Sequence, residues 1–181
     1  GQRTTPLGEL ELKDVRVPDA AVLGGRTGVG MAMFNHAMNW ERTCLFAAHA
    51  GTMRRLLGLA IKRAKTRKQF GKPIGAFQAI SHKIANMKIR TDAARLLAYH
   101  AASRLDRARE VALDAAVVKT FVGEAWVQSA QDLMQICGGA GYLEHTGVER
   151  HLRDSLSATL YSGTSEIQRN IIAGWLGLPQ T

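Results

Sequence analysis

The sequence of 181 residues has only two cysteines, Cys44 and Cys137, and contains no C-x-x-C pair. This scarcity excludes a disulfide-stapled secreted fold and a cysteine-based zinc site. The six histidines do not have metal-ligand spacing either, so we expect no metal. Apolar residues flank both cysteines, and we expect two buried thiols in a reducing compartment, the cytoplasm.

Long apolar runs are also absent, and the N-terminal GQRTTPLGEL has no apolar signal-peptide core. The sequence therefore predicts a soluble protein with no membrane partner. Lysine and arginine outnumber aspartate and glutamate by 24 to 15, a formal charge of +9. Such a charge suits nucleic acid, an anionic surface or a phosphate-bearing small molecule, or forms a solvated basic face. Aromatic residues make up only 6% and no nucleic-acid-binding module is present, so we expect no nucleic-acid partner.

One convincing strand signal is present, in residues 7–23, LGELELKDVRVPDAAVL, where apolar and charged positions alternate. The alternation changes phase at Lys13-Asp14, which predicts a bulge or bend. A lone strand cannot bury its own surface, so its sheet partners would lie on other sequence.

Helical periodicity dominates the rest of the chain, which is 46% hydrophobic overall. We expect helices over about 31–65, 80–109 and 115–137, the last stopped by the glycines of GGAGY, and shorter helices over about 145–157 and 164–175. Long helices with brief connections predict an all-α fold, a helical bundle.

Two segments could contact a ligand. GGAGY follows a helical pattern rather than a buried strand, which argues against a Rossmann fingerprint but leaves room for a pyrophosphate near backbone N–H groups. KTRKQFGKPIGAFQ combines cations with aromatic residues, which suits a nucleotide or an ordinary basic turn between helices.

NWERTCLFAAHAG, residues 39–51, places Glu41 and Arg42 beside Trp40 on a largely apolar helix. A carboxylate there is either paired with an Arg for structure or kept for proton transfer, because desolvation raises a carboxyl pKa toward neutrality. Ser162, in LYSGTSEIQR, lacks the elbow of a nucleophilic serine and belongs to no triad, so we interpret it as a cap or filler.

Four segments in order, RKQFGKPIGAFQAISHKIANM, QICGGAGY, VERHLRDS and GTSEIQRNIIAGWLG, resemble the C-terminal part of the acyl-CoA dehydrogenase family. The resemblance implies an FAD-dependent enzyme of fatty acid or amino acid catabolism that assembles as a homotetramer or homodimer. It assigns residues 1–22 to the end of a middle β domain and residues 23–181 to the C-terminal helical-bundle domain.

The same resemblance implies three sets of FAD contacts. An FAD held mainly by a neighbouring subunit would meet Arg67, Gln69, Phe70 and Gln78. Its pyrophosphate or adenine end would lie against Gln135, Gly138 and Gly139. Thr164 and Glu166 would contact the subunit's own flavin nucleotide, where a helix N-terminus favours phosphate.

The family's usual sequence has a Glu directly before the Gly-Thr of the last loop, where this chain has Ser162. In the isovaleryl- and long-chain-type branches the catalytic base comes instead from an L-E-R-like segment of the first long helix. The W-E-R of this chain matches that segment, which implies that Glu41 is the base, in an apolar pocket near Trp40. Asn39, Arg42, Tyr161 and Ser162 would line the substrate channel.

The implied reaction is α,β-dehydrogenation of an acyl thioester to a trans-2-enoyl thioester, with an electron-transferring flavoprotein as the expected acceptor. Three alternatives remain open. The substrate could be an acyl or prolyl group on a carrier protein, the enzyme could be a flavin oxidase or monooxygenase, or the chain could be a non-catalytic assembly subunit.

Overall fold

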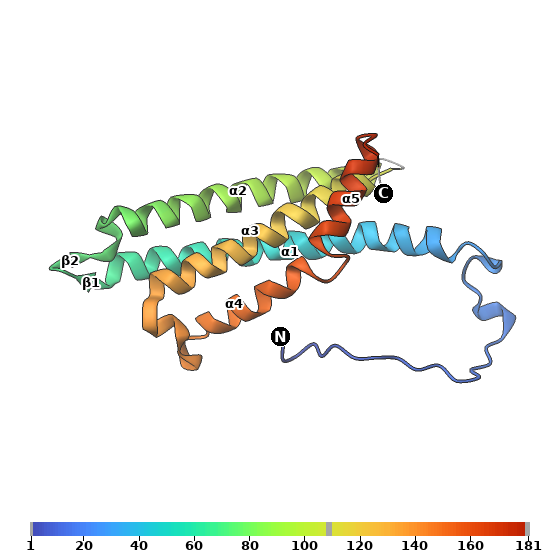
Figure 1. The fold of residues 1–181 in the computed structure, drawn as a ribbon, viewed down its shortest axis with the longest axis horizontal. Helices are drawn as coiled ribbons and strands as arrows, with labels where there is room; N and C mark the ends of the chain where they lie inside the picture. Colours follow the sequence, from blue (N-terminus) through green and yellow to red (C-terminus); the bar gives the residue numbers. More distant parts are fainter. Residues whose placement is uncertain (1, 108–109, 180–181) are drawn as a thin grey trace.

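Three long helices lie side by side and form most of the structure, a computed structural model that describes residues 2–107 and 110–179 (Figure 1). They are α1 (Gly30–Thr66), α2 (Gln78–Arg107) and α3 (Ala112–Cys137). Two shorter helices follow, α4 (Val148–Leu156) and α5 (Ser165–Trp175). The predicted all-α helical bundle is confirmed. The fourth helix starts later than predicted because residues Glu144–Thr146 form a separate 3-10 turn and Gly147 then has a left-handed backbone, φ 68°.

Helix α3 is the centre of the bundle and packs against α1, α2, α4 and α5. Its sequence is mostly small and aliphatic, so half of its residues can be buried while the neighbouring helices approach closely. Met53, Leu56, Met87, Val122 and Leu133 have no exposed surface and come from α1, α2 and α3. The core therefore lies along the line where these three helices meet.

A short hairpin joins α1 to α2 at one end of the bundle. Its strands are β1 (Lys68–Gln69) and β2 (Lys72–Pro73), antiparallel, with Lys68 opposite Pro73. Phe70 and Gly71 form the turn, and both have positive φ angles, 52° and 78°. A 3-10 turn (Ile74–Ala76) then leads into α2.

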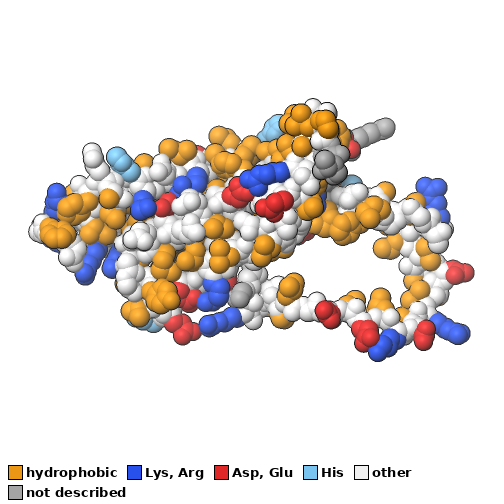
Figure 2. All heavy atoms as spheres, in the orientation of Figure 1, with side chains coloured by type: hydrophobic (Ala, Val, Ile, Leu, Met, Phe, Trp, Pro, Cys, Tyr) orange, Lys and Arg blue, Asp and Glu red, His pale blue; other side chains and the backbone are white. Residues whose placement is uncertain are grey.

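The segment before α1 is extended but forms no strand between residues 2 and 18, although the sequence predicts one in 7–23. Two 3-10 turns follow, at Asp19–Ala21 and Leu23–Gly25. The predicted bend is confirmed, since Asp14 has a φ of 48°. Strand pairing needs a second backbone, and the described residues provide none here. The alternating apolar side chains are therefore exposed, and Figure 2 shows them on an arm that stands off the bundle.

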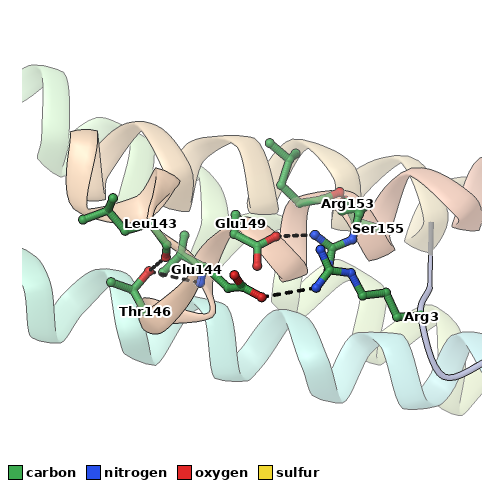
Figure 3. A network of polar contacts seen from close by, with 9 residues as sticks. Arg3, Leu143, Glu144, Thr146, Glu149, Arg153 and Ser155 are labelled. Atoms are coloured by element: carbon green, nitrogen blue, oxygen red, sulfur yellow. Dashed lines mark hydrogen bonds and ion pairs between the residues drawn. The ribbon is translucent and has the colours of Figure 1, made fainter.

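The start of this arm returns to the bundle near α4, where Arg3 pairs with Glu144 at 3.2 Å (Figure 3). Beside them Glu149 and Arg153 form an ion pair one helical turn apart on α4. Both side chains of the Arg3 pair are largely exposed, so we expect the pair to add little stability.

A polar contact also ties α2 to α3. Asp132 of α3 is buried and pairs with Arg90 and with Lys83, the latter at 3.3 Å. Arg90 Nε also donates to Ser129 Oγ at 3.2 Å. The carboxylate has partners on both oxygens, which offsets the cost of burying it.

The two thiols differ from the prediction. Cys44 is exposed and Cys137 is half-buried. Cys44 lies on the exposed face of α1. Its apolar neighbours in sequence do not determine which face of the helix it occupies. Within the described ranges, no helix combines the length and hydropathy needed to cross a bilayer.

Candidate active site

Glu41 and Ser162 are 121 positions apart in the sequence and meet where α1 passes the loop before α5. Ser162 Oγ donates a hydrogen bond to Glu41 Oε1 at 2.7 Å. The structural pairing of Glu41 with Arg42 is not formed, since Arg42 Nε donates instead to the backbone carbonyl of Ser162 at 2.9 Å. Among the described residues no Lys, Arg or His nitrogen lies within ion-pair distance of the Glu41 carboxylate.

The backbone at Ser162 has a φ of 60°, in the left-handed region that residues with a Cβ seldom adopt. Its carbonyl oxygen also accepts from Nε2 of Gln168, at 3.1 Å, so two side chains fix one peptide unit. No backbone carbonyl of the described residues accepts the N–H of Ser162. This donor is therefore available to a ligand.

Gly163 is required by this packing. It has a φ of 85°, and a Cβ there would lie 2.7 Å from Nε2 of Gln168. The Gln168 side chain is fully buried, and its Nε2 also donates to the Gly163 carbonyl at 3.3 Å. Gln168 thus restrains the loop by donating hydrogen bonds to two of its backbone carbonyl groups.

An aromatic cluster supports the same loop from α1 and α3. The hydroxyl of Tyr161 forms a short hydrogen bond with Nε2 of His49, and the His49 ring stacks on Trp126 with centroids 4.3 Å apart. Burial lowers the pKa of His49 to about 4 and raises the pKa of Tyr161 to about 12. Both groups are therefore neutral near pH 7, and the pair presents no charge to the site.

The predicted apolar pocket around Glu41 is not formed by the described residues. Glu41 is exposed and Trp40 is 47% exposed. Asn39 is half-buried, and its backbone carbonyl accepts from the Thr43 hydroxyl at 2.9 Å. One face of the carboxylate is therefore open to whatever covers this part of α1.

The N-terminus of α5 follows the loop directly. Thr164 is the N-cap, and its hydroxyl accepts from the N–H of Ile167 at 3.4 Å. Hydrogen bonds from its own backbone N–H and from Thr164 lower the pKa of the exposed Glu166. Thr164 and Glu166 thus lie at a helix end that favours negative charge, and their contact with the flavin nucleotide stays a prediction.

A second cluster lies at the hairpin end of the bundle, where Figure 2 shows Lys and Arg side chains among apolar ones. It surrounds a cavity of about 640 Å³. The cavity is lined by Arg63, Arg67, Gln69, Phe70, Ile74, Phe77, Ile80, Ile136, Cys137, Gly138, Gly139 and Ala140. Five of the residues predicted to bind FAD are in this set. The predicted Gln78 and Gln135 are exposed and do not line the cavity.

The cavity fits an aromatic, anionic ligand. Phe70 is 90% exposed and meets Phe77 edge to face, with centroids 6.0 Å apart. No atom lies within 4 Å of the Cβ positions of Gly138 and Gly139, so a ligand can approach the backbone closely. Nε of Arg63 is buried and has no hydrogen-bond partner in the described part of the chain. An adenine ring and a pyrophosphate match these features.

Sequence reasoning missed three residues of these sites: His49, Arg63 and Gln168. Arg63 lies four residues before Arg67, at the last turn of α1, and this closeness in sequence could have indicated it. His49 and Gln168 belong to ordinary apolar-periodic helices, and only the packing of α1, α3 and α5 brings them to the loop. Among the described residues no group of His, Cys, Asp or Glu has the arrangement of a metal site.

The bundle and the loop before α5 define the C-terminal helical domain of a flavoprotein dehydrogenase family. The family described as "Acyl-CoA dehydrogenase, C-terminal domain" matches residues 28–177, and the chain belongs to this family, whose members are FAD-dependent.

Its relatives differ in their named substrates. The chain is 46% identical over 97% of its length to an L-prolyl-[peptidyl-carrier protein] dehydrogenase of Pseudomonas fluorescens, and covers 46% of that protein. It is 42% identical, again over 97%, to an acyl-CoA dehydrogenase of Bacillus subtilis, and covers 45% of it. The FAD complex of PigA has a TM-score of 0.82 and 41% identity, over 85% of this chain and 40% of PigA. The chain thus spans about half the length of the curated relatives it matches.

Proposed function

We propose that the chain forms part of an FAD-dependent dehydrogenase that converts an acyl thioester to a trans-2-enoyl thioester, with Glu41 as the base. The contact between Glu41 and Ser162 carries this proposal. It brings a carboxylate from α1 to the loop position where the family's usual sequence has a Glu. An enzymatic base needs such a place close to its target proton.

The residues of this chain have separate tasks in the reaction. Glu41 removes a proton from the α-carbon of the thioester. FAD, when bound, would supply the acceptor for the hydride that leaves the β-carbon. The N–H group of Ser162, unpaired within the described backbone, would stabilise the charge that develops on the thioester oxygen. Backbone donors do not depend on the side chain at position 162, so a serine there is compatible with this task.

We further propose that one chain contacts two FAD molecules. Glu41 lies on α1 and Arg67 caps the C-terminus of that helix, which separates the two residues by roughly 40 Å at 1.5 Å per residue. One extended dinucleotide does not span that length. Arg63 and Arg67 would hold the pyrophosphate of a neighbouring copy's FAD, and Phe70 would cover its adenine. Thr164 and Glu166 would contact the chain's own flavin nucleotide, which makes the protein a homo-oligomer.

Anaerobic flavin reduction in the complete protein tests the proposed function. Oxidised FAD should bleach on addition of a thioester, and Glu41→Gln should slow the bleaching by at least about a hundredfold. The exposed Glu144→Gln serves as the matched control and should keep the wild-type rate. A purified protein without FAD, or flavin that no thioester reduces, would contradict the proposal and favour an assembly subunit.

The group that carries the thioester, coenzyme A or a carrier protein, needs a separate test. Similarity to an L-prolyl-[peptidyl-carrier protein] dehydrogenase and to PigA favours a prolyl group on a carrier protein, and similarity to acyl-CoA dehydrogenases favours coenzyme A. The panel should therefore contain L-prolyl carrier protein beside short, branched and long acyl-CoA. An electron-transferring flavoprotein and oxygen are the two acceptors to compare afterwards, since fast reoxidation by oxygen would indicate an oxidase.

A further inference from the structure

We propose that Ser162 is a positioning residue for the base: its hydroxyl holds one oxygen of the Glu41 carboxylate and leaves the other oxygen for the substrate proton. This inference rests on the proposed function. The hydrogen bond from Ser162 Oγ to Glu41 Oε1 measures 2.7 Å and is the contact that joins the two residues. Because a serine hydroxyl is neutral, it fixes the carboxylate without the charge compensation that an Arg partner would bring.

The backbone at Ser162 supports a role beyond filling the loop. Its φ of 60° is strained for a residue with a Cβ, and glycine would adopt it without strain. Strained residues persist where the surrounding structure holds them, and they concentrate at functional sites. The side chain of this residue reaches α1, where its hydroxyl contacts Glu41.

Three neighbours hold this conformation. Arg42 Nε donates to the Ser162 carbonyl at 2.9 Å, and Gln168 Nε2 donates to the same oxygen at 3.1 Å. Gly163 permits the close approach of Gln168. Two donors on one carbonyl restrain the orientation of this peptide unit, and with it the backbone that carries the Ser162 side chain.

The same contacts explain why Arg42 forms no close ion pair with Glu41 although it is the next residue. Successive residues on a helix point about 100° apart, and the guanidinium of Arg42 turns to the loop carbonyl. The carboxylate is thereby left with the serine as its partner. The arrangement separates two tasks, with Arg42 and Gln168 holding the loop and Ser162 holding the base.

The test compares Ser162→Ala and Ser162→Gly in the complete, FAD-containing protein. Both remove the hydroxyl, and the glycine variant also removes the strain at φ 60°, so it should fold even where the alanine variant does not. We expect flavin reduction at saturating thioester to slow by about tenfold in both, with the half-saturating concentration within about twofold of wild type. Thr159→Val is the matched control, because its hydroxyl donates to the Leu156 carbonyl at 3.0 Å and not to Glu41.

A double-mutant cycle separates positioning from a structural role. In a Glu41→Ala background, the further change Ser162→Gly should alter the residual rate by less than about twofold, because the group that Ser162 positions is gone. Wild-type rates in both single variants would overturn the inference, as would an unchanged tenfold loss in the Glu41→Ala background. If no thioester reduces the flavin of the wild-type protein, the proposed function itself is overturned. This outcome is distinct from the two that would overturn only the role of Ser162.

Discussion

The amino group of Lys119 on α3 lies 5.7 Å from the centre of the Phe46 ring on α1, inside the bundle. Lys119 has no exposed surface, and its Nζ has no hydrogen-bond partner among the described residues. Burial lowers the pKa of Lys119 to about 8. An aromatic face attracts a cation but does not replace the hydrogen bonds of water, so this lysine weakens the fold.

Replacing this lysine with an apolar residue of similar length should stabilise the protein. We expect Lys119→Met to raise the free energy of unfolding at pH 7 by about 1–3 kcal/mol. Between pH 8 and 10.5 the unfolded wild type binds more protons than the folded one, so its stability rises with pH and approaches that of the variant. Chemical denaturation at pH 7 and pH 10 measures both effects, with the exposed Lys62→Met as control. A less stable Met variant would contradict the prediction.

Acid should destabilise the aromatic cluster beneath the loop. The pKa of His49 is lowered from 6.5 to about 4 by burial, so the unfolded state binds more protons between these values. Stability that depends on His49 should therefore be present above pH 6.5 and be lost progressively down to pH 4. The wild type should lose more stability over this range than His49→Gln, whereas the exposed His82→Gln should follow the wild type. Parallel curves for wild type and His49→Gln would refute this.

The buried carboxylate of Asp132, between α2 and α3, should contribute far more to the free energy of unfolding than an exposed carboxylate. Asp132→Asn removes the charge that Arg90 and Lys83 share, and we expect a loss of about 2–4 kcal/mol in unfolding free energy. Asp92→Asn is the matched control, since Asp92 pairs with Lys88 one turn away on the surface of α2. It should cost less than about 0.5 kcal/mol. Thermal and urea unfolding of both variants give the comparison.

Adding one methyl group to the loop should disturb the site. In Gly163→Ala the new Cβ would lie 2.7 Å from Gln168 Nε2 at a φ of 85°, and we expect at least about a tenfold slower flavin reduction together with a lower melting temperature. Gly58→Ala is the control, because Gly58 lies in α1 with open space around it. That change should stabilise the helix by up to about 1 kcal/mol. Equal activity of the two variants would show that the loop tolerates the side chain.

Much of the fold could be predicted from the sequence because its helices are long and strongly periodic. The glycines of GGAGY stop α3 at Cys137 as expected. The strand in residues 7–23 has the right pattern, but a pattern does not supply the second backbone that pairing requires. Likewise, Cys44 has apolar neighbours in sequence and still faces outward, because burial depends on which face of α1 meets α3.

The parts of the site that depend on sequence motifs could be predicted, whereas the parts that depend on how the helices pack could not. The meeting of Glu41 with the Ser162 loop was expected, whereas the direction of Arg42 toward the Ser162 carbonyl was not. Gln168 and Lys119 are polar residues on buried helix faces, and periodicity alone would assign such faces to apolar side chains. Their roles depend on distances between helices, which a single sequence does not contain.

One uninterrupted helix, α1, carries both Glu41 and Arg63 of the hairpin cavity, and Arg67 caps its C-terminus. A single inserted or deleted residue between them would rotate one site about the helix axis by roughly 100° relative to the other and shift it by about 1.5 Å. The spacing of the two ends is therefore locked to the helical register. Length changes in this part of the chain can preserve the relative orientation of both sites only in steps close to whole turns, so the length of α1 fixes how far apart the two sites lie.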